Sequence, residues 1–441
     1  MFTIMVRSPQ VFVAALFPLG AAAAVLAQAP VQVNVSSMGF NIPGDAANEP
    51  SIAVDPTNPR RMAIGWRQFD SISSSIREAG WGWSEDAGRT WHFPGVLERG
   101  VFRSDPLLGS LADGTFLYCS MRQDFYCQMY RSENGGQSWG PSVPSYGGDK
   151  SWMAIDRTKG PSRDHTYLHW STEENPYPGT PFVRSTDGGL TFDAPVSMPD
   201  PMRWGTLAVG AEGALFIAGV RSLPLDSDTF LFTRSDNARD ASQAVSFTQP
   251  RVLAMGGGMP WATGPNPSGL LAQVWVDVDR SDGPYSGRIY VLSGVDPAPV
   301  GAVNDPLDVH LIWSDSGGTT WSPYTRVNPD PMGANSWNWH GTMSVAPNGR
   351  IEVVWLSTHE SGSMNVARLY STSSTDGGST FAAPVAQTPA FNSTAGWPQQ
   401  QKMGDYFHMV SDLTGADLAF CTTVNGEQDV YYLRIGPRPQ R

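Results

Sequence analysis

Carboxylates, cations and tryptophans gather immediately before several short apolar runs of this sequence. Aromatic faces pack against sugar rings, and charged groups bind hydroxyls and acidic substituents. Brought together by the fold, such side chains have the chemistry of a carbohydrate pocket. The residues are Asn48, Glu49, Arg103, Asp105, Asp149, Lys150, Trp152, Arg203, Trp204, Trp337, Trp339, His340, Asp405 and Tyr406.

A repeated eight-residue turn indicates which elements position these side chains. Each copy has Ser, any residue, Asp or a near substitute, any residue, Gly, any residue, Thr or Ser, and then an aromatic residue. A carboxylate accepts hydrogen bonds from its own turn, and glycine allows the positive φ that the turn needs. The pattern therefore predicts repeated hairpin turns. The copies occupy residues 84–91, 132–139, 185–192, 314–321 and 374–381.

The repeated turn resembles the Asp box of the sialidase-like β-propellers. The resemblance implies an all-β fold: a single β-propeller of four-stranded antiparallel blades. Copies begin at Ser84, Ser132 and Ser185, spacings of 48 and 53 residues, near the blade length of about 40 to 50 residues. Seven inner strands are predicted, at residues 50–54, 106–111, 152–155, 205–209, 271–278, 342–345 and 406–410.

Seven blades are preferred, and six remain the alternative. The unit at residues 203–253 lacks a good copy of the turn, so an insertion there would leave six blades. The last unit, residues 404–435, has room for three strands. We therefore expect residues 31–37 to supply its outer strand, which closes the ring and removes two open sheet edges.

The N-terminal 27 residues have the pattern of a secretory signal peptide. Arg7 precedes an apolar run at residues 11–26, and small residues follow at suitable cleavage positions. An uncleaved anchor is the alternative, but Pro18 and Gly20 interrupt a run that is short for a membrane span. We expect a secreted or periplasmic protein, without a membrane segment after cleavage, whose propeller domain is residues 28–441.

The amino-acid composition limits which ligands and cofactors the protein is expected to bind. The 441-residue chain carries a net charge of -12, which argues against nucleic acid as a ligand. The seven histidines show no metal-ligand spacing, and no cofactor is expected. Asp277, Asp279 and Asp282 could bind a structural calcium ion, although a solvated turn is the favoured interpretation. A carbohydrate ligand and a monomeric chain are expected.

If the protein is exported, its cysteines meet an oxidising compartment in which disulfides form. Cys119 and Cys127 flank residues 121–124, a predicted hairpin loop, and could form a disulfide in an oxidising compartment. Two small buried thiols are an equally good interpretation. Cys421 has no partner that the sequence identifies.

The family resemblance extends to part of the active site. Arg67 matches an arginine that binds the substrate carboxylate, and Asp70 lies in the loop of the family's acid/base aspartate. Asp105-Pro106 resembles the family's Asp-Pro, and Tyr406 occupies the place of its nucleophilic tyrosine. Alternative structural roles are a solvated loop for Asp70 and blade packing for Tyr406.

Other positions depart from the family pattern. Asn48 stands where the family has a first arginine, and His340 stands near the expected glutamate. Residues 356–358 replace a further arginine. Paired, charge-assisted hydrogen bonds to a carboxylate would be lost, which argues against ordinary sialidase activity.

The leading hypothesis is a glycoside hydrolase acting on an acidic or complex glycan. Alternatives are a non-catalytic propeller that binds glycan or protein, and a polysaccharide lyase in which His340 and Tyr406 exchange protons while an arginine or Lys150 neutralises a uronate. The predicted catalytic residues are Asp70, Tyr406, Glu49 and His340. The predicted substrate-binding residues are Arg67, Arg103, Asp105, Asp149, Lys150, Trp152, Arg203 and Trp339.

Overall fold

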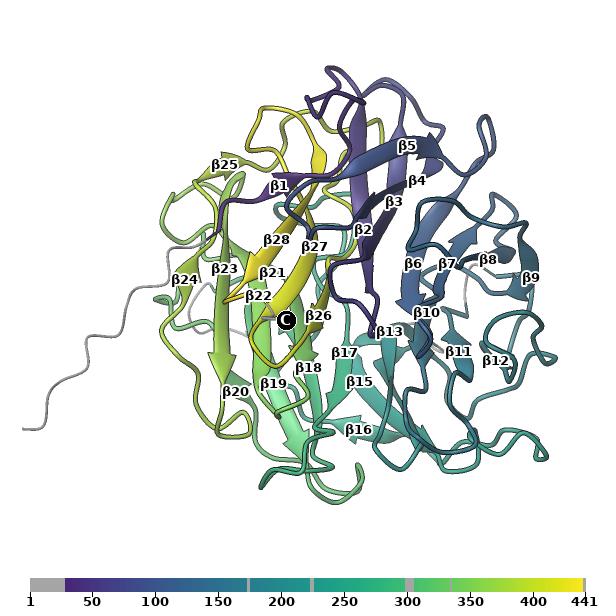
Figure 1. Ribbon diagram of the computed structural model, residues 1–441. Coiled ribbons are helices and arrows are strands. Elements are labelled where there is room, and N and C mark those ends of the chain that lie inside the picture. Colours follow the sequence, from purple (N-terminus) through teal and green to yellow (C-terminus); the bar gives the residue numbers. More distant parts are fainter. Residues whose placement is uncertain (1–27, 173–174, 223–225, 298–304, 334, 439–441) are drawn as a thin grey trace, which may run out of the picture.

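Seven antiparallel sheets surround a central channel in the computed structural model (Figure 1). The structure describes residues 28–438 except 173–174, 223–225, 298–304 and 334. The predicted signal peptide, residues 1–27, lies outside the described residues. Within them no helix occurs, and none could therefore cross a membrane. The all-β prediction is confirmed.

The first four blades follow one another in chain order. The first contains β2 (Ala46–Val54), β3 (Met62–Phe69), β4 (Glu78–Ser84) and β5 (His92–Val96). The second contains β6 (Ser104–Ser110), β7 (Phe116–Met121), β8 (Cys127–Ser132) and β9 (Val143–Tyr146). The third contains β10 (Trp152–Ile155), β11 (Thr166–His169) and β12 (Phe182–Ser185), with an isolated bridge from Phe182 to Val196 at its edge. The fourth contains β13 (Met202–Val209), β14 (Leu215–Arg221), β15 (Asp226–Ser235) and β16 (Arg251–Leu253).

The remaining blades complete the ring. The fifth contains β17 (Trp275–Val278), β18 (Ile289–Val295), β19 (Asp308–Ser314) and β20 (Thr325–Arg326). The sixth contains β21 (Asn338–Val345), β22 (Ile351–Ser357), β23 (Val366–Ser374), β24 (Val385–Ala386) and β25 (Phe391–Asn392). The seventh contains β26 (His408–Ser411), β27 (Ala416–Thr422), β28 (Asp429–Ile435) and β1 (Val31–Gln32).

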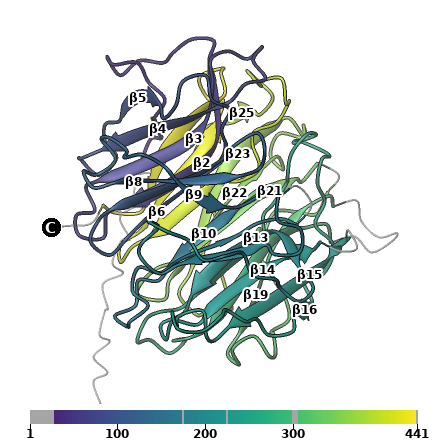
Figure 2. The same cartoon turned by 90° about the vertical axis from the view of Figure 1, so that its right-hand side faces the viewer.

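The ring closes as the sequence predicts. Strand β1 pairs with β28, with Val31 opposite Tyr432, so the two ends of the chain share one blade. Both Figure 1 and Figure 2 show the purple N-terminal strands beside the yellow C-terminal strands. The fourth blade is a complete four-stranded sheet. Seven blades are therefore confirmed, and the six-blade alternative is wrong.

Several inner strands begin at a different residue from the one that the sequence predicts. Strand β2 begins at Ala46 rather than at residue 50, because pairing with β3 continues through a register shift between Asn48 and Ser51. In contrast, β17 and β26 begin later than predicted, at Trp275 and His408. The apolar pattern located the inner strands, but it did not reveal the irregular pairing at their starts.

The repeated turns have hydrogen bonds that explain their sequence. Asp86 accepts hydrogen bonds from the backbone N–H groups of Arg89 and Thr90 and from the Thr90 hydroxyl, at 2.8, 3.0 and 2.7 Å. The Ser84 hydroxyl donates to the same carboxylate at 2.9 Å. Asp187 and Asp376 make the corresponding contacts with Thr191 and Thr380. Each carboxylate thus satisfies the backbone of its own turn.

Strand direction places these turns opposite the starts of the inner strands. Within a blade the strands alternate in direction, so β4 runs parallel to β2 and its final residue, Ser84, lies at the end where β2 finishes. The turn end of the channel is therefore the opposite end from Glu49. Hydroxyl groups link neighbouring blades along the channel: Ser51 Oγ accepts from Leu108 N, and Thr206 Oγ1 accepts from Val276 N.

The three cysteines are free thiols buried in the blades. In the β7–β8 hairpin Cys119 lies opposite Met129, and Cys127 lies opposite Met121. The two cysteines are therefore diagonal neighbours on the ladder. The two thiols contact each other, and the hydrogen bond with Cys127 lowers the pKa of Cys119. Both are buried free thiols in this structure, and the disulfide stays a prediction for an oxidising compartment.

Candidate functional site

The starts of the inner strands share a strained backbone conformation. The pairing register shifts at this point in the first, second, fourth and sixth blades. A residue with positive φ lies at each shift: Glu49, Asp105, Trp204 and His340, with φ between 48° and 55°. Lys150 has a φ of 52° just before β10. A non-glycine residue in this region costs about 1 to 3 kcal/mol, and such strain is concentrated at functional sites.

Two lysines join the carboxylates at this end of the channel. Lys150 Nζ lies 3.0 Å from Asp405 Oδ2, 3.1 Å from Asp149 Oδ1 and 3.7 Å from Asp105 Oδ1. Lys402 Nζ lies 2.6 Å from Asp405 Oδ2 and 3.2 Å from Glu49 Oε1. The first, second, third and seventh blades are thus joined by one set of ion pairs.

Arg67, on β3, adds a third cation to these ion pairs through Glu49 of the same blade. Its Nη2 lies 3.0 Å from Glu49 Oε1, and its Nε donates to Asn48 Oδ1 at 2.8 Å. Its Nη1 donates to Gln400 Oε1 at 2.9 Å. We call Glu49, Arg67, Asp105, Asp149, Lys150, Lys402 and Asp405 the charge cluster.

The carboxyl groups of the charge cluster differ in their affinity for protons. Burial raises the pKa of Glu49 to about 7 despite the nearby cations Arg67 and Lys402. Burial also raises the pKa of Asp149 to about 6, against the effect of Lys150. Burial opposes ionisation of Asp105 and Asp405 as well, but Lys150 outweighs it and the pKa of each falls below its usual value. Two groups therefore exchange protons near neutral pH and two remain anionic.

Exposure separates the groups that a ligand can reach from those it cannot. The side chains of Glu49 and Asp405 are 0% and 1% exposed. Those of Lys150 and Asp149 are 11% and 21% exposed. Asp149 is therefore the carboxyl group that combines access from solvent with a pKa near neutral pH, as a general acid requires.

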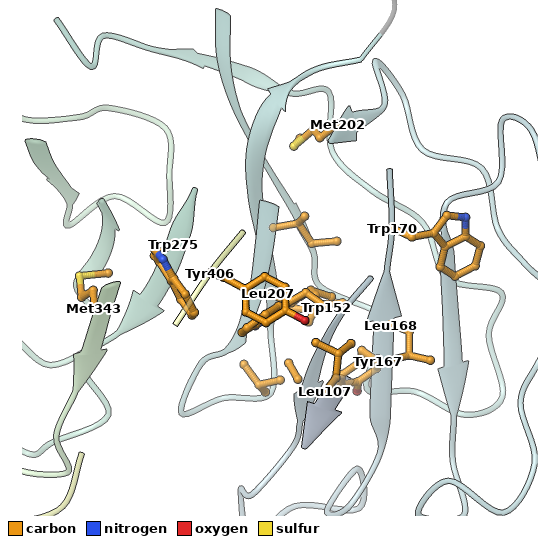
Figure 3. Packing of buried hydrophobic residues seen from close by; sticks show 14 of the residues in the cluster. Leu107, Trp152, Tyr167, Leu168, Trp170, Met202, Leu207, Trp275, Met343 and Tyr406 are labelled. Atoms are coloured by element: carbon orange, nitrogen blue, oxygen red, sulfur yellow. The ribbon is translucent and has the colours of Figure 1, made fainter. Parts of the chain in front are cut away.

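Tyr406 lies beneath the charge cluster, packed into the channel wall. It is buried, and its hydroxyl donates to the Pro106 carbonyl at 3.2 Å. Its ring makes an edge contact with Trp152 at 5.3 Å between centroids, and Figure 3 shows the two side by side. Burial raises the pKa of Tyr406 well above its usual value. The phenol is therefore neutral and held by the backbone.

The structure separates several other predicted site residues from the charge cluster. The Asp70 side chain is exposed and pairs with Arg99 at 2.8 Å. Arg103 is buried against Glu98 and donates to the Tyr130 hydroxyl at 2.7 Å, within the second blade. Neither Asp70 nor Arg103 contacts a member of the charge cluster.

Arg203, Trp339 and His340 are packed inside blades. The Arg203 guanidinium lies 3.8 Å from the centroid of the Trp204 ring. His340 and Trp339 are buried against each other, and the His340 ring contacts the Leu270 carbonyl through Nε2 at 3.2 Å. Burial lowers the pKa of His340 to about 4, so its ring is neutral at pH 7.

Sequence reasoning missed Lys402, which contacts two carboxylates of the charge cluster. A compositional signal was present. The chain contains three lysines, Lys150, Lys159 and Lys402, and the first and last come shortly before inner strands. The described residues contain no group of three or more His, Cys, Asp or Glu side chains arranged to hold a metal ion.

Comparisons with known proteins show the fold. No family model matches the chain, and no curated protein sequence does. An ulvan lyase, described as a new family of polysaccharide lyase, aligns with a TM-score of 0.50 and 11% identity over 93% of this chain and 94% of its own. A protein of unknown function from Dyadobacter fermentans has a TM-score of 0.49 and 14% identity, covering 93% of this chain and 99% of its own. A GH93 α-L-arabinofuranosidase of Fusarium graminearum has a TM-score of 0.47 and 12% identity, covering 93% and 98%. The likeness to the ulvan lyase, with a TM-score of 0.50, concerns the fold alone, because an identity of 11% carries no statement about activity.

Proposed function

We propose that this protein is a carbohydrate-active propeller that cleaves a glycosidic bond in an acidic glycan, with Asp149 as the proton donor. The observation that carries the proposal is the position of Asp149. It is partly exposed, its pKa lies near 6, and Lys150 joins it to the buried carboxylates Asp105 and Asp405. Such a group can protonate a leaving oxygen at mildly acidic pH.

The charge balance of the site favours an acidic substrate. Arg77 adds a fourth cation near the start of the second blade, where its Nε donates to the Ser104 hydroxyl, next to Asp105, at 3.3 Å. When Glu49 and Asp149 carry protons, the four cations face the ionised carboxylates of Asp105 and Asp405. The site then has a local positive charge, although the chain as a whole is anionic.

A second candidate is a propeller that binds glycan without cleaving it. The observation that favours it is the contact between Glu49 and Arg67, which are both buried and lie 3.0 Å apart, so that neither is open to a ligand. The sialidase-type mechanism receives less support, because Tyr406 is buried with its hydroxyl bound to a backbone carbonyl. The lyase alternative also receives less support, because its proposed base, His340, is buried.

The experiment is incubation of the purified protein with sialylated glycans and with polyuronates, followed by mass analysis of the products. Hydrolysis adds the mass of water, whereas elimination gives an unsaturated product without it. Release of hydrolysis products by the wild type and their loss in Asp149→Asn would support the proposal. Saturable binding without any product would support the second candidate instead.

A further inference from the structure

A layer of aromatic rings crosses the middle of the channel. The centroids of Trp152 and Trp275 lie 5.0 Å apart, and Tyr406 lies 5.3 Å from Trp152. Figure 3 shows these three side chains meeting between the inner strands. His408 stacks on Trp275 with ring centroids 6.2 Å apart. The layer lies between the charge cluster at one end of the channel and the part of the channel toward the repeated turns.

A cavity of about 730 Å³ lies on the turn side of this layer. Its volume falls within the range of about 300 to 1,000 Å³ that is typical of small-molecule sites. Inner strands of different blades supply apolar walls, which include Ile155, Leu207, Val276 and Met343. The cavity reaches Lys159 and Ala211 in the turns that follow β10 and β13. Its mouth is therefore at the turn end, opposite the charge cluster.

His408 offers one hydrogen-bond donor at the inner end of the cavity. Its Nδ1 lies 3.2 Å from the Ile52 backbone nitrogen, which can only donate, so Nδ1 accepts. The Ser51 hydroxyl lies 2.9 Å from the same Nδ1. The proton of the neutral imidazole must then be on Nε2. No hydrogen bond joins Nε2 to any of the described residues, and His408 lines the cavity.

The mouth of the cavity is positively charged. Arg157 donates to the backbone carbonyl and the hydroxyl of Ser110, and it has no carboxylate partner within the described part of the chain. Lys159 is exposed and forms no ion pair with any described residue. Arg280 is paired with Asp277 at 2.8 Å, and Asp282 adds one further negative charge. The mouth therefore has three cations and two carboxylates.

We infer that this cavity is a second binding site, separate from the charge cluster, for an alkyl carboxylate with a polar group at its far end. The carboxylate lies at the mouth near Arg157 and Lys159, the alkyl chain contacts the apolar walls, and a terminal oxygen accepts from His408 Nε2. From His408 to Ser411 the strand rises about 10 Å, which matches a medium-length chain. Occupancy of this site does not depend on activity at the other end.

The test is calorimetric titration of the wild-type protein at neutral pH with ω-hydroxyoctanoate, octanoate and octyltrimethylammonium. We expect ω-hydroxyoctanoate to bind with one-to-one stoichiometry. Octanoate should bind about five-fold more weakly, because it lacks the acceptor for His408. Octyltrimethylammonium should show no saturable binding, because the mouth repels cations. Equal affinity for octanoate and octyltrimethylammonium would show apolar binding without selection by charge, and no saturable heat with any ligand would show a water-filled channel. Either result would overturn the inference.

Two surface variants locate the site without disturbing the core. Lys159→Glu should weaken binding of both carboxylates about three- to ten-fold, whereas Arg251→Glu, an equal charge change on the exposed outer strand β16, should leave binding unchanged. Ala211→Trp places a large side chain at the exposed mouth and should abolish binding. Thermal unfolding of each variant serves as the control for folding. Wild-type affinity in both Lys159→Glu and Ala211→Trp would exclude this cavity as the site.

Discussion

Lys150 Nζ lies 3.0 Å from Asp405 Oδ2 and thereby links the third blade to the seventh across the end of the channel. Removing one partner of a buried ion pair costs about 3 to 5 kcal/mol, because the other charge stays buried and unpaired. We expect Lys150→Met to lower the free energy of unfolding by that amount, as measured by denaturant unfolding. Lys159→Met, at an exposed lysine, should change it by less than about 0.5 kcal/mol. Equal effects of the two variants would contradict a structural role for the charge cluster.

The pH dependence of stability should reveal the proton on Glu49. Its pKa is near 4.5 when exposed and rises to about 7 in the folded protein, so the native state binds the additional proton between these values. The Glu49 contribution to stability is therefore present at low pH and is lost as pH rises through this window. Glu49→Gln should flatten the dependence, seen as a smaller difference between unfolding free energies at about pH 5 and about pH 7. An identical slope in both proteins would show that Glu49 titrates normally.

Asp149→Asn should test the proposed proton donor. A general acid must be protonated, so kcat/KM should fall as pH rises through about 6, the folded pKa of Asp149. The variant should be about 10²- to 10⁴-fold slower than the wild type, and its kcat/KM should no longer fall as pH rises through this value. Asp70→Asn is the comparison, because Asp70 is exposed and away from the charge cluster. Loss of activity in Asp70→Asn alone would favour the assignment implied by the sialidase resemblance.

Tyr406→Phe also separates the sialidase-type mechanism from the mechanism with Asp149 as the proton donor. The sialidase resemblance predicts a nucleophile, and such a variant would abolish turnover. In the structure the hydroxyl donates to the Pro106 carbonyl, so the variant should instead cost about 0.5 to 1.5 kcal/mol of stability and change turnover by a small factor. Paired measurements of unfolding and of product formation decide between these outcomes.

The repeated turns offer a test that does not depend on function. Burial opposes ionisation of Asp376, but hydrogen bonds from Thr380 and Ser374 keep its pKa below the usual value. Asp376→Ala should lower the free energy of unfolding by about 1 kcal/mol, because the turn backbone loses its acceptor. Asp376→Asn should cost less, since Asn134 fills the corresponding position in the second blade and accepts from Ser138 N at 3.1 Å. Thermal unfolding of both variants gives the comparison.

The sequence determined the architecture because its signals are local. The five turns specify their own hydrogen bonds, and each marks the end of a third strand. Apolar runs located seven inner strands, and the short last unit required the N-terminal strand that β1 supplies. Such features depend on residues close together in the chain, so they can be identified without the tertiary structure.

Tertiary structure alone decided which polar residues meet. Asp70, Arg103 and Asp149 are all polar residues beside inner or second strands, yet burial and pairing leave only Asp149 of the three in the charge cluster. Lys402 joins Glu49 and Asp405 through contacts that depend on closure of the ring. The ionisation of these carboxyl groups also depends on the tertiary structure, because burial and neighbours from distant blades set the pKa of each one. The residue types were visible in the sequence, whereas their protonation and access to solvent follow from packing.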